Sequence, residues 1–202
     1  MLLKIHPDNP QKRVISKICD LLKRGELVIF PTDTQYALGC DIFNHKGIER
    51  IFKLKGEVKP LCFMCHDLSQ LSDYAQFETN SYKLMKRLFP GPYTFILKAT
   101  KAVPKALVKN KKTVGIRIPQ NNFCKELLQE YGHPIVTTSA RFLDMEPLRD
   151  PDEIELKYHK HVGAIVHAGI CSHDESTIVD LSGEEFKILR RGAGDVSQIE
   201  QS

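Results

Sequence analysis

The sequence lacks an apolar run long enough to cross a membrane, and it lacks the pattern of an N-terminal leader. No stretch approaches the roughly 18 apolar residues that a transmembrane helix needs. The first ten residues, MLLKIHPDNP, include a lysine, a histidine and an aspartate, which do not fit a secretory signal peptide. We therefore expect a cytoplasmic protein with no membrane partner, whose six cysteines are thiols rather than disulfides.

The familiar signatures of phosphate binding and of nucleophilic catalysis are also missing. The chain contains no GxxxxGK[ST] phosphate loop, no GxGxxG and no GxSxG, and no nucleophile stands beside an obvious base. If the protein is an enzyme, we expect it to work by positioning its substrates and by positive charge, as in phosphoryl and nucleotidyl transfer.

The segment CFMCH at 62–66 matches the CxxCH pattern of covalent haem attachment and contains CxxC, which is half of a zinc or redox site. Residues 61–65 have the composition of a buried strand, and in an extended segment Cys62 and Cys65 point to opposite faces. The chain has no second CxxC for zinc. We predict a core strand here, and no metal site.

Acidic residues are missing from a stretch of 47 residues between Thr79 and Lys125. This stretch holds 11 of the 29 lysines and arginines, so the rest of the chain is net negative although the whole chain carries +4. Such asymmetry bears on partners rather than on fold. It fits a surface that binds phosphates or nucleic acid, and it also fits a basic surface that only faces solvent.

Short apolar runs alternate with segments of helical periodicity along the chain. One helix is expected to begin with Asn9 as N-cap and Pro10 as its first residue, and to end at Gly25. Strands are expected at 27–30, 61–65, 93–97, 113–118, 134–136, 164–166, 178–181 and 186–189, with further helices around 48–54, 67–71, 82–88 and 123–128. Because some strands follow each other directly, the expected fold is α/β (α+β in stricter usage), a twisted mixed sheet with packed helices, in one domain over residues 1–202.

Polar groups suited to a ligand follow several of these strands. The segment PTDTQYALG at 31–39 comes directly after a buried strand, where α/β proteins usually place ligands. In the alternating strand 113–118, a period of two puts Arg117 on the face opposite the aliphatic residues. Three hydroxyl residues at 137–139 follow another strand. Alternatively, the hydroxyl groups only stabilise turns or cap helices, and Arg117 is only a surface charge.

Seven motifs, in chain order, carry a resemblance to one family. They are PTDTQYALG at 31–39, LKGEVKPL at 54–61, FPGPYTFIL at 89–97, VGIRIP at 114–119, PIVTTSA at 134–140, STIVDLS at 176–182 and ILRRGAGD at 188–195. Together they resemble the YrdC/YciO family, whose best-known members are threonylcarbamoyl-adenylate synthases. The segments IHPDNP at 5–10, MCHDLSQLS at 64–72 and the RRGAGDV ending look most like the YciO branch.

The resemblance implies a twisted mixed sheet around a basic concave cavity, and it implies a reaction. In that reaction L-threonine, bicarbonate and ATP give threonylcarbamoyl-AMP and pyrophosphate, for threonylcarbamoyl modification of adenosine in tRNA. The resemblance assigns Thr34, Arg117, Thr137 and Thr177 to threonine, and Lys55, Thr113, Ser139, Ser176 and Arg190 to the nucleotide, with Lys55 also catalytic. Mg²⁺ is expected to arrive bound to the nucleotide, and no protein-held metal is expected.

Three positions depart from the pattern of the synthases. Glu57 stands where they typically carry an arginine, Arg141 where they carry an asparagine, and Arg191 where they carry a proline. A glutamate in place of a phosphate-binding arginine repels phosphate, so these departures suggest a YciO-type member with altered or weak activity. The alternative is a module that binds double-stranded RNA, tRNA or the ribosome with the same basic cavity and without turnover.

Overall fold

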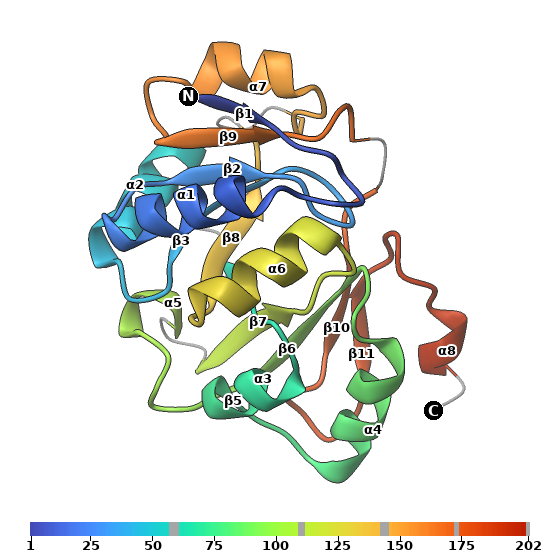
Figure 1. Ribbon diagram of the computed structural model, residues 1–202. Helices are drawn as coiled ribbons and strands as arrows, with labels where there is room; N and C mark the ends of the chain where they lie inside the picture. Colours follow the sequence, from blue (N-terminus) through green and yellow to red (C-terminus); the bar gives the residue numbers. More distant parts are fainter. Residues whose placement is uncertain (57–60, 109–111, 142–145, 172–173, 201–202) are drawn as a thin grey trace.

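The computed structural model describes residues 1–56, 61–108, 112–141, 146–171 and 174–200 (Figure 1). The departure predicted to matter most, Glu57, lies outside the described residues. Among the helices that are described, none is long and apolar enough to span a membrane.

All described strands join one mixed sheet, which confirms the predicted fold class. The sheet order is β1 (Leu2–Lys4), β9 (Ala164–His167), β2 (Val28–Phe30), β3 (Ala37–Asp41), β8 (Ile135–Ser139), β4 (Cys62–Met64), β7 (Thr113–Arg117), β6 (Tyr93–Ala99), β10 (Thr177–Asp180) and β11 (Lys187–Arg190), with β5 (Ala75–Gln76) paired to β6. The pairs β1–β9, β9–β2, β4–β7 and β6–β10 are parallel, and the others are antiparallel.

Helices cover both faces of this sheet (Figure 1). They are α1 (Lys12–Lys23), α2 (His45–Lys55), α3 (Leu68–Tyr74), α4 (Thr79–Leu88), α5 (Lys105–Val108), α6 (Asn122–Tyr131), α7 (Pro151–Tyr158) and α8 (Ser197–Glu200). Helices α1 and α6 lie side by side over one face, and α7 packs on β9.

The predicted start of the first helix is wrong, whereas its predicted end is confirmed. The carbonyl of Gln11 accepts the first helical hydrogen bonds, from the N–H groups of Val14 and Ile15, so α1 begins after Gln11 and not at Asn9. Gly25 ends the helix in the left-handed region with φ +82°, a conformation that costs glycine little.

Alternation along the strands divides the core in two. On β8, Ile135 packs with α1 and α6 in one cluster, whereas Val136 belongs to the larger cluster on the other face. On β4, Met64 and Phe63 divide in the same way. Because side chains alternate along a strand, Thr137 lies on the face covered by α1 and α6. The polar positions of β8, β4 and β7 therefore share one face of the sheet.

The segment 31–39 is only partly a loop. Its last three residues, from Ala37 to Gly39, form the start of β3 and pair with both β2 and β8. A Cβ atom at Gly39 would lie 2.9 Å from the carbonyl oxygen of Val136, so only glycine fits this close crossing. The loop proper is short, and the paired strand holds both of its ends on the sheet.

Candidate functional site

The loop after β2 holds its hydroxyl groups by bonds within itself. The Thr32 hydroxyl donates to the Gln35 carbonyl at 2.6 Å and accepts from the Thr34 N–H at 3.1 Å. The two threonine hydroxyl oxygens are 3.1 Å apart. Thr34 is 2% exposed, and its carbonyl accepts a hydrogen bond from the Cys171 thiol. Thr34, predicted to contact threonine, is thus held in one conformation by its neighbours.

Arg117, predicted to bind a carboxylate, already has one. Its Nη2 donates to Asp33 Oδ1 at 2.6 Å, and the two side chains are 9% and 6% exposed. The other oxygen of Asp33 accepts the N–H of Gln120 at 3.0 Å. The Nε of Arg117 is buried and has no partner among the described residues. The pair joins the end of β7 to the loop that carries Thr34.

One row of residues crosses four strands on the face shared by the polar positions. Gly39, Thr137, Cys62 and Gly115 stand opposite one another on β3, β8, β4 and β7. A Cβ atom at Gly115 would lie 3.3 Å from Cys62 Cβ and 3.2 Å from Thr94 Cγ2 on β6. Gly115 therefore leaves a bare backbone between the polar side chains of β4 and β6, on the same face as Arg117.

Lys55 reaches the end of β8 from the last residue of α2. Its Nζ donates to the Ser139 carbonyl at 3.1 Å. The helix ends there because Gly56 adopts the left-handed conformation with φ +64°. Ser139 is partly exposed and lies on the same face of β8 as Thr137. Lys55 therefore contacts the end of β8 that carries Ser139, and its assignment to the same site as Thr137 stays a prediction.

A second cluster joins β6, β10 and β11. The hydroxyl oxygens of Ser176 and Thr94 are 2.8 Å apart, and Arg190 Nη2 donates to Ser176 Oγ at 3.2 Å. Arg190 also donates to one carboxylate oxygen of Glu175, and Arg141 Nη2 donates to the other at 3.3 Å. Glu175 thus lies between the guanidinium groups of Arg190 and Arg141. Arg141 is one of the three residues that depart from the expected synthase pattern.

Two of the predicted site residues, Thr177 and Thr113, lie apart from the groups described above. Thr177 is fully buried, and its hydroxyl donates to the Gly194 carbonyl at 2.7 Å and accepts from the Gly192 N–H at 3.0 Å. The threonine contact assigned to Thr177 stays a prediction, because this hydroxyl is engaged within the chain. Thr113 lies at the start of β7, on the face of Gly115 but away from Arg117 at the strand's end.

The CFMCH segment forms a core strand, as predicted. Cys62 contacts Thr137 on the polar face, with its sulfur 3.5 Å from the hydroxyl oxygen, whereas Cys65 is buried in the larger apolar cluster on the other side. In the part of the chain that the structure describes, no three His, Cys, Asp or Glu side chains are grouped so as to hold a metal ion.

Comparison with known proteins identifies the family. A sequence profile of the Sua5/YciO/YrdC domain, described as telomere recombination, matches residues 20–192. The chain belongs to the Sua5/YciO/YrdC family. The uncharacterized protein YciO of Escherichia coli K12 is 39% identical over 196 residues, which are 95% of each chain. The crystal structure of E. coli YciO matches with a TM-score of 0.93 and 38% identity, covering 98% of each chain.

Other family relatives carry the name of an activity. A putative threonylcarbamoyl-AMP synthase of Methanocaldococcus jannaschii is 28% identical over 205 residues, which are 98% of this chain and 96% of the relative. The crystal structure of P. abyssi Sua5 complexed with L-threonine matches with a TM-score of 0.93 and 25% identity, covering all of this chain and 60% of that one. The fold is therefore that of the family, and its homologues include proteins named as synthases.

Several residues at the candidate site were not identified from the sequence. Asp33 and Glu175 neutralise three of the site's arginines, and nothing local in the sequence indicates those pairings. Gly115 and Cys62 form the floor between the polar clusters. Gly115 had a usable signal, since a glycine inside an alternating strand often marks a place where another group approaches closely.

Proposed function

We propose that the chain joins L-threonine, bicarbonate and ATP to form threonylcarbamoyl-AMP and pyrophosphate. Threonine and bicarbonate first combine to a carbamate with loss of water. A carbamate oxygen then attacks the α-phosphorus of ATP, the bond from that phosphorus to the bridging oxygen breaks, and pyrophosphate leaves. Both reactants are anions, so the site must offset their repulsion, and fixed positive charge does this without a nucleophilic side chain.

The threonine would bind where Thr34 and Arg117 meet. Its carboxylate would pair with the guanidinium of Arg117, whose buried Nε has no partner among the described residues and which is oriented by Asp33. The hydroxyl groups of Thr34 and Thr137 supply neutral hydrogen bonds. Asp33 lowers the net charge at this end of the site, which favours a ligand with one carboxylate over a polyphosphate.

The nucleotide would bind toward the end of β8 and the β10–β11 pair. Lys55 is proposed as the catalytic cation at the phosphates, and the hydroxyl groups of Ser139 and Ser176 as donors beside it. Arg190 adds a second cation. The two carboxylates at the site, Asp33 and Glu175, are each paired with guanidinium groups, so they suit Mg²⁺ poorly as ligands. In this proposal Mg²⁺ is held by the phosphates and offsets their charge.

One observation carries the proposal. Of the residues that the resemblance assigns to one site, Arg117, Thr137, Ser139 and Ser176 lie on one face of the sheet, where Asp33 links Arg117 to the loop of Thr34 and Ser176 links Thr94 to Arg190. Lys55 reaches the end of β8 from α2, and Thr177 lies on the other face with Val179.

The test is pyrophosphate release by the purified chain. We expect release from ATP only when threonine and bicarbonate are both present. We expect Lys55→Ala to lower that rate about 100-fold, as the loss of one stabilising group in a transition state does. Lys53→Ala is the matched control, because Lys53 lies in the same last turn of α2 and is exposed. Absence of threonine-dependent release from the unmodified chain at high concentration contradicts the proposal.

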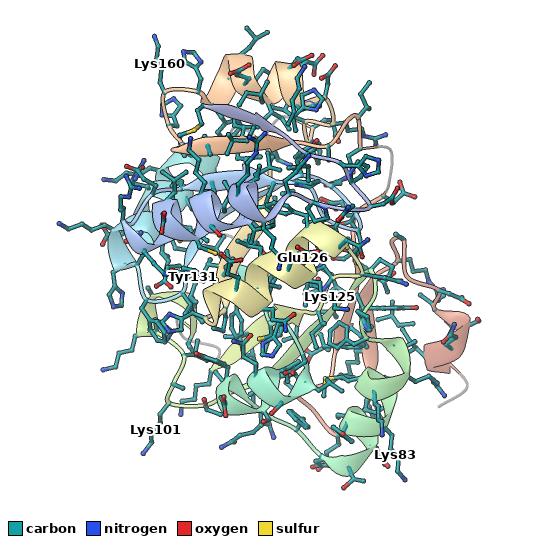
Figure 2. The ribbon with its side chains drawn as sticks, in the orientation of Figure 1. Lys83, Lys101, Lys125, Glu126, Tyr131 and Lys160 are labelled. Atoms are coloured by element: carbon teal, nitrogen blue, oxygen red, sulfur yellow. The ribbon has the colours of Figure 1, made fainter. Side chains whose placement is uncertain are left out.

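The acid-free stretch from Thr79 to Lys125 supports a second candidate, an RNA-binding module without turnover. Its lysines do not all lie in one place, since Lys83 belongs to α4, Lys125 belongs to α6, and Lys101 lies in the turn after β6 (Figure 2). Binding of double-stranded RNA or tRNA should weaken steeply as salt rises, because phosphate contacts release counterions. RNA binding that does not change with salt contradicts this candidate.

A further inference from the structure

A cavity of about 640 Å³ lies outside the site described above. It is bounded by the loop from β4 into α3, by the end of α4, and by the loop from β7 into α6. Strands β4 and β7 are parallel neighbours, so the cavity lies at the carboxyl ends of two parallel strands, where α/β sheets usually bind ligands. Its volume is in the range of small-molecule sites.

The wall of this cavity is partly apolar. Phe89, Ile118 and Leu128 line it, each less than 10% exposed in the folded chain. Phe89 also packs against Phe95 at a ring distance of 4.9 Å, which fixes the orientation of its ring. A flat apolar body would bury its surface against this wall.

The rim of the cavity is basic. Lys86 of α4 and Lys125 of α6 line it, and neither forms an ion pair with any residue that the structure describes. The nearby carboxylate, Asp67, is already engaged, because Oδ1 caps α3 at Gln70 N and Oδ2 lies 2.9 Å from His66 Nε2. Two lysines of the rim therefore have no anion to balance them.

Two further observations indicate polar recognition. His66 lines the cavity, and its Nδ1 is buried with no hydrogen-bond partner among the described residues. Asn121 lines it at the start of α6, a helix of ten residues whose positive dipole end faces this region. The helix end favours a ligand that carries a negative charge, and the unpartnered Nδ1 of His66 offers the ligand a position for a hydrogen bond.

We propose that this cavity binds a small organic anion, with a flat apolar body against Phe89 and Ile118 and one acidic group between Lys86 and Lys125. The volume of about 640 Å³ suits one small molecule rather than an extended strand of nucleic acid, which would need a continuous groove. Gln120 lines the cavity and donates its N–H to Asp33, so the two sites share one wall but no ligand-binding side chain.

The test uses two fluorescent probes that share an aromatic skeleton. They are 8-anilinonaphthalene-1-sulfonate and its uncharged counterpart, N-phenyl-1-naphthylamine. We expect saturable binding of the sulfonate at one site per chain. Lys86→Ala/Lys125→Ala should weaken it about tenfold, since two charged contacts at exposed positions are lost together. The uncharged probe should be unaffected by the same double variant.

The matched control is Lys101→Ala/Lys160→Ala, which removes the same charge from exposed positions away from the cavity (Figure 2). It should leave sulfonate binding unchanged, and the thermal unfolding of both variants should match that of the unmodified chain because all four lysines are exposed. The proposal is overturned if no saturable binding occurs, or if both double variants weaken binding equally. It is also overturned if the uncharged probe loses as much affinity as the sulfonate.

Discussion

Glu175 offsets part of the positive charge on the proposed nucleotide side of the site. It lies between Arg141 and Arg190, which would otherwise both be available to phosphates. The guanidinium of Arg141 and the carboxylate of Glu175 together add no net charge beside Arg190. We interpret Glu175 as a carboxylate that competes with phosphate for these two arginines.

Replacing this carboxylate should strengthen nucleotide binding. In Glu175→Gln we expect ATP to bind about three- to tenfold more tightly, because a partly exposed negative charge is removed from beside two guanidinium groups. Isothermal titration with ATP measures this. Glu200→Gln is the matched control, since Glu200 pairs with the exposed Arg191. Equal or weaker ATP affinity in Glu175→Gln would mean that Glu175 orients the arginines rather than competing with phosphate.

The reactivity of the cysteines can report on ligand binding at the face of the sheet that carries Cys62. Burial raises the pKa of Cys40 to about 12 and that of Cys19 to about 11, and it also raises the pKa of Cys65 and Cys124. At about pH 8 these four remain protonated and therefore react slowly with iodoacetamide. The partly exposed Cys62 and Cys171 should react first.

Because Cys62 lies beside Thr137, we expect ATP with threonine to slow the labelling of Cys62. Mass spectrometry of peptides measures the extent at each cysteine, and the unfolded chain, in which all six should react, is the control. Labelling of Cys62 at the same rate with and without these ligands would place their binding elsewhere.

The matched motifs supply the candidate side chains of the site, among them Thr34, Lys55 and Arg117. Lys55 contacts the Ser139 carbonyl and Arg117 contacts Asp33, which precedes Thr34, and the roles assigned to these residues stay predictions. Their partners could not be predicted, because Asp33 meets Arg117 across 84 positions of sequence and local periodicity carries no information on such pairs. The pairing of charges depends on the register of the whole sheet.

At the scale of elements, Asn44 fixes the helix that carries Lys55. Its Oδ1 accepts the N–H of Gly47 as the N-cap of α2, at 2.9 Å, and its Nδ2 donates to the carbonyl of Gly25 at the end of α1, also at 2.9 Å. One side chain therefore caps one helix and ties it to the turn that closes another.

Asn44→Ala should lower the free energy of unfolding by about 1–2 kcal/mol, as the loss of an N-cap does. Asn44→Asp keeps the capping oxygen and loses the donor to Gly25, so it should fall between the alanine variant and the unmodified chain. Urea unfolding followed by circular dichroism measures the difference. If both variants were as stable as the unmodified chain, the cap would not stabilise α2.

The elements that the sequence predicted well are those with a clear period or a clear cap. The helix at 67–71 is confirmed as α3, with Asp67 as its N-cap. Strand β1 was missed because it has three residues and pairs with β9 from the far end of the chain. Helix α7 was missed because only its first residue, Ile154 and Tyr158 are buried, too few for a period, although Asp150 before a proline is a typical start.

At the scale of the whole molecule, the sheet gathers a site from almost the entire chain. Strands β3, β8, β4, β7, β6 and β10 are neighbours in that order although they are far apart in sequence. The same topology in E. coli YciO and in P. abyssi Sua5 shows that the arrangement is a property of the family. The sheet is common to the family, whereas the reaction that this chain performs depends on the identity of its own side chains.

The most direct test of that question is to look for the proposed product itself. The purified chain would be incubated with ATP, L-threonine and bicarbonate labelled with carbon-13, and the mixture analysed by mass spectrometry. We expect a threonylcarbamoyl-AMP that contains the heavy carbon and that disappears when threonine is omitted or Lys55 is replaced by alanine. A mixture in which AMP and pyrophosphate form without any labelled adenylate, or in which nothing forms, would contradict the proposed synthase activity.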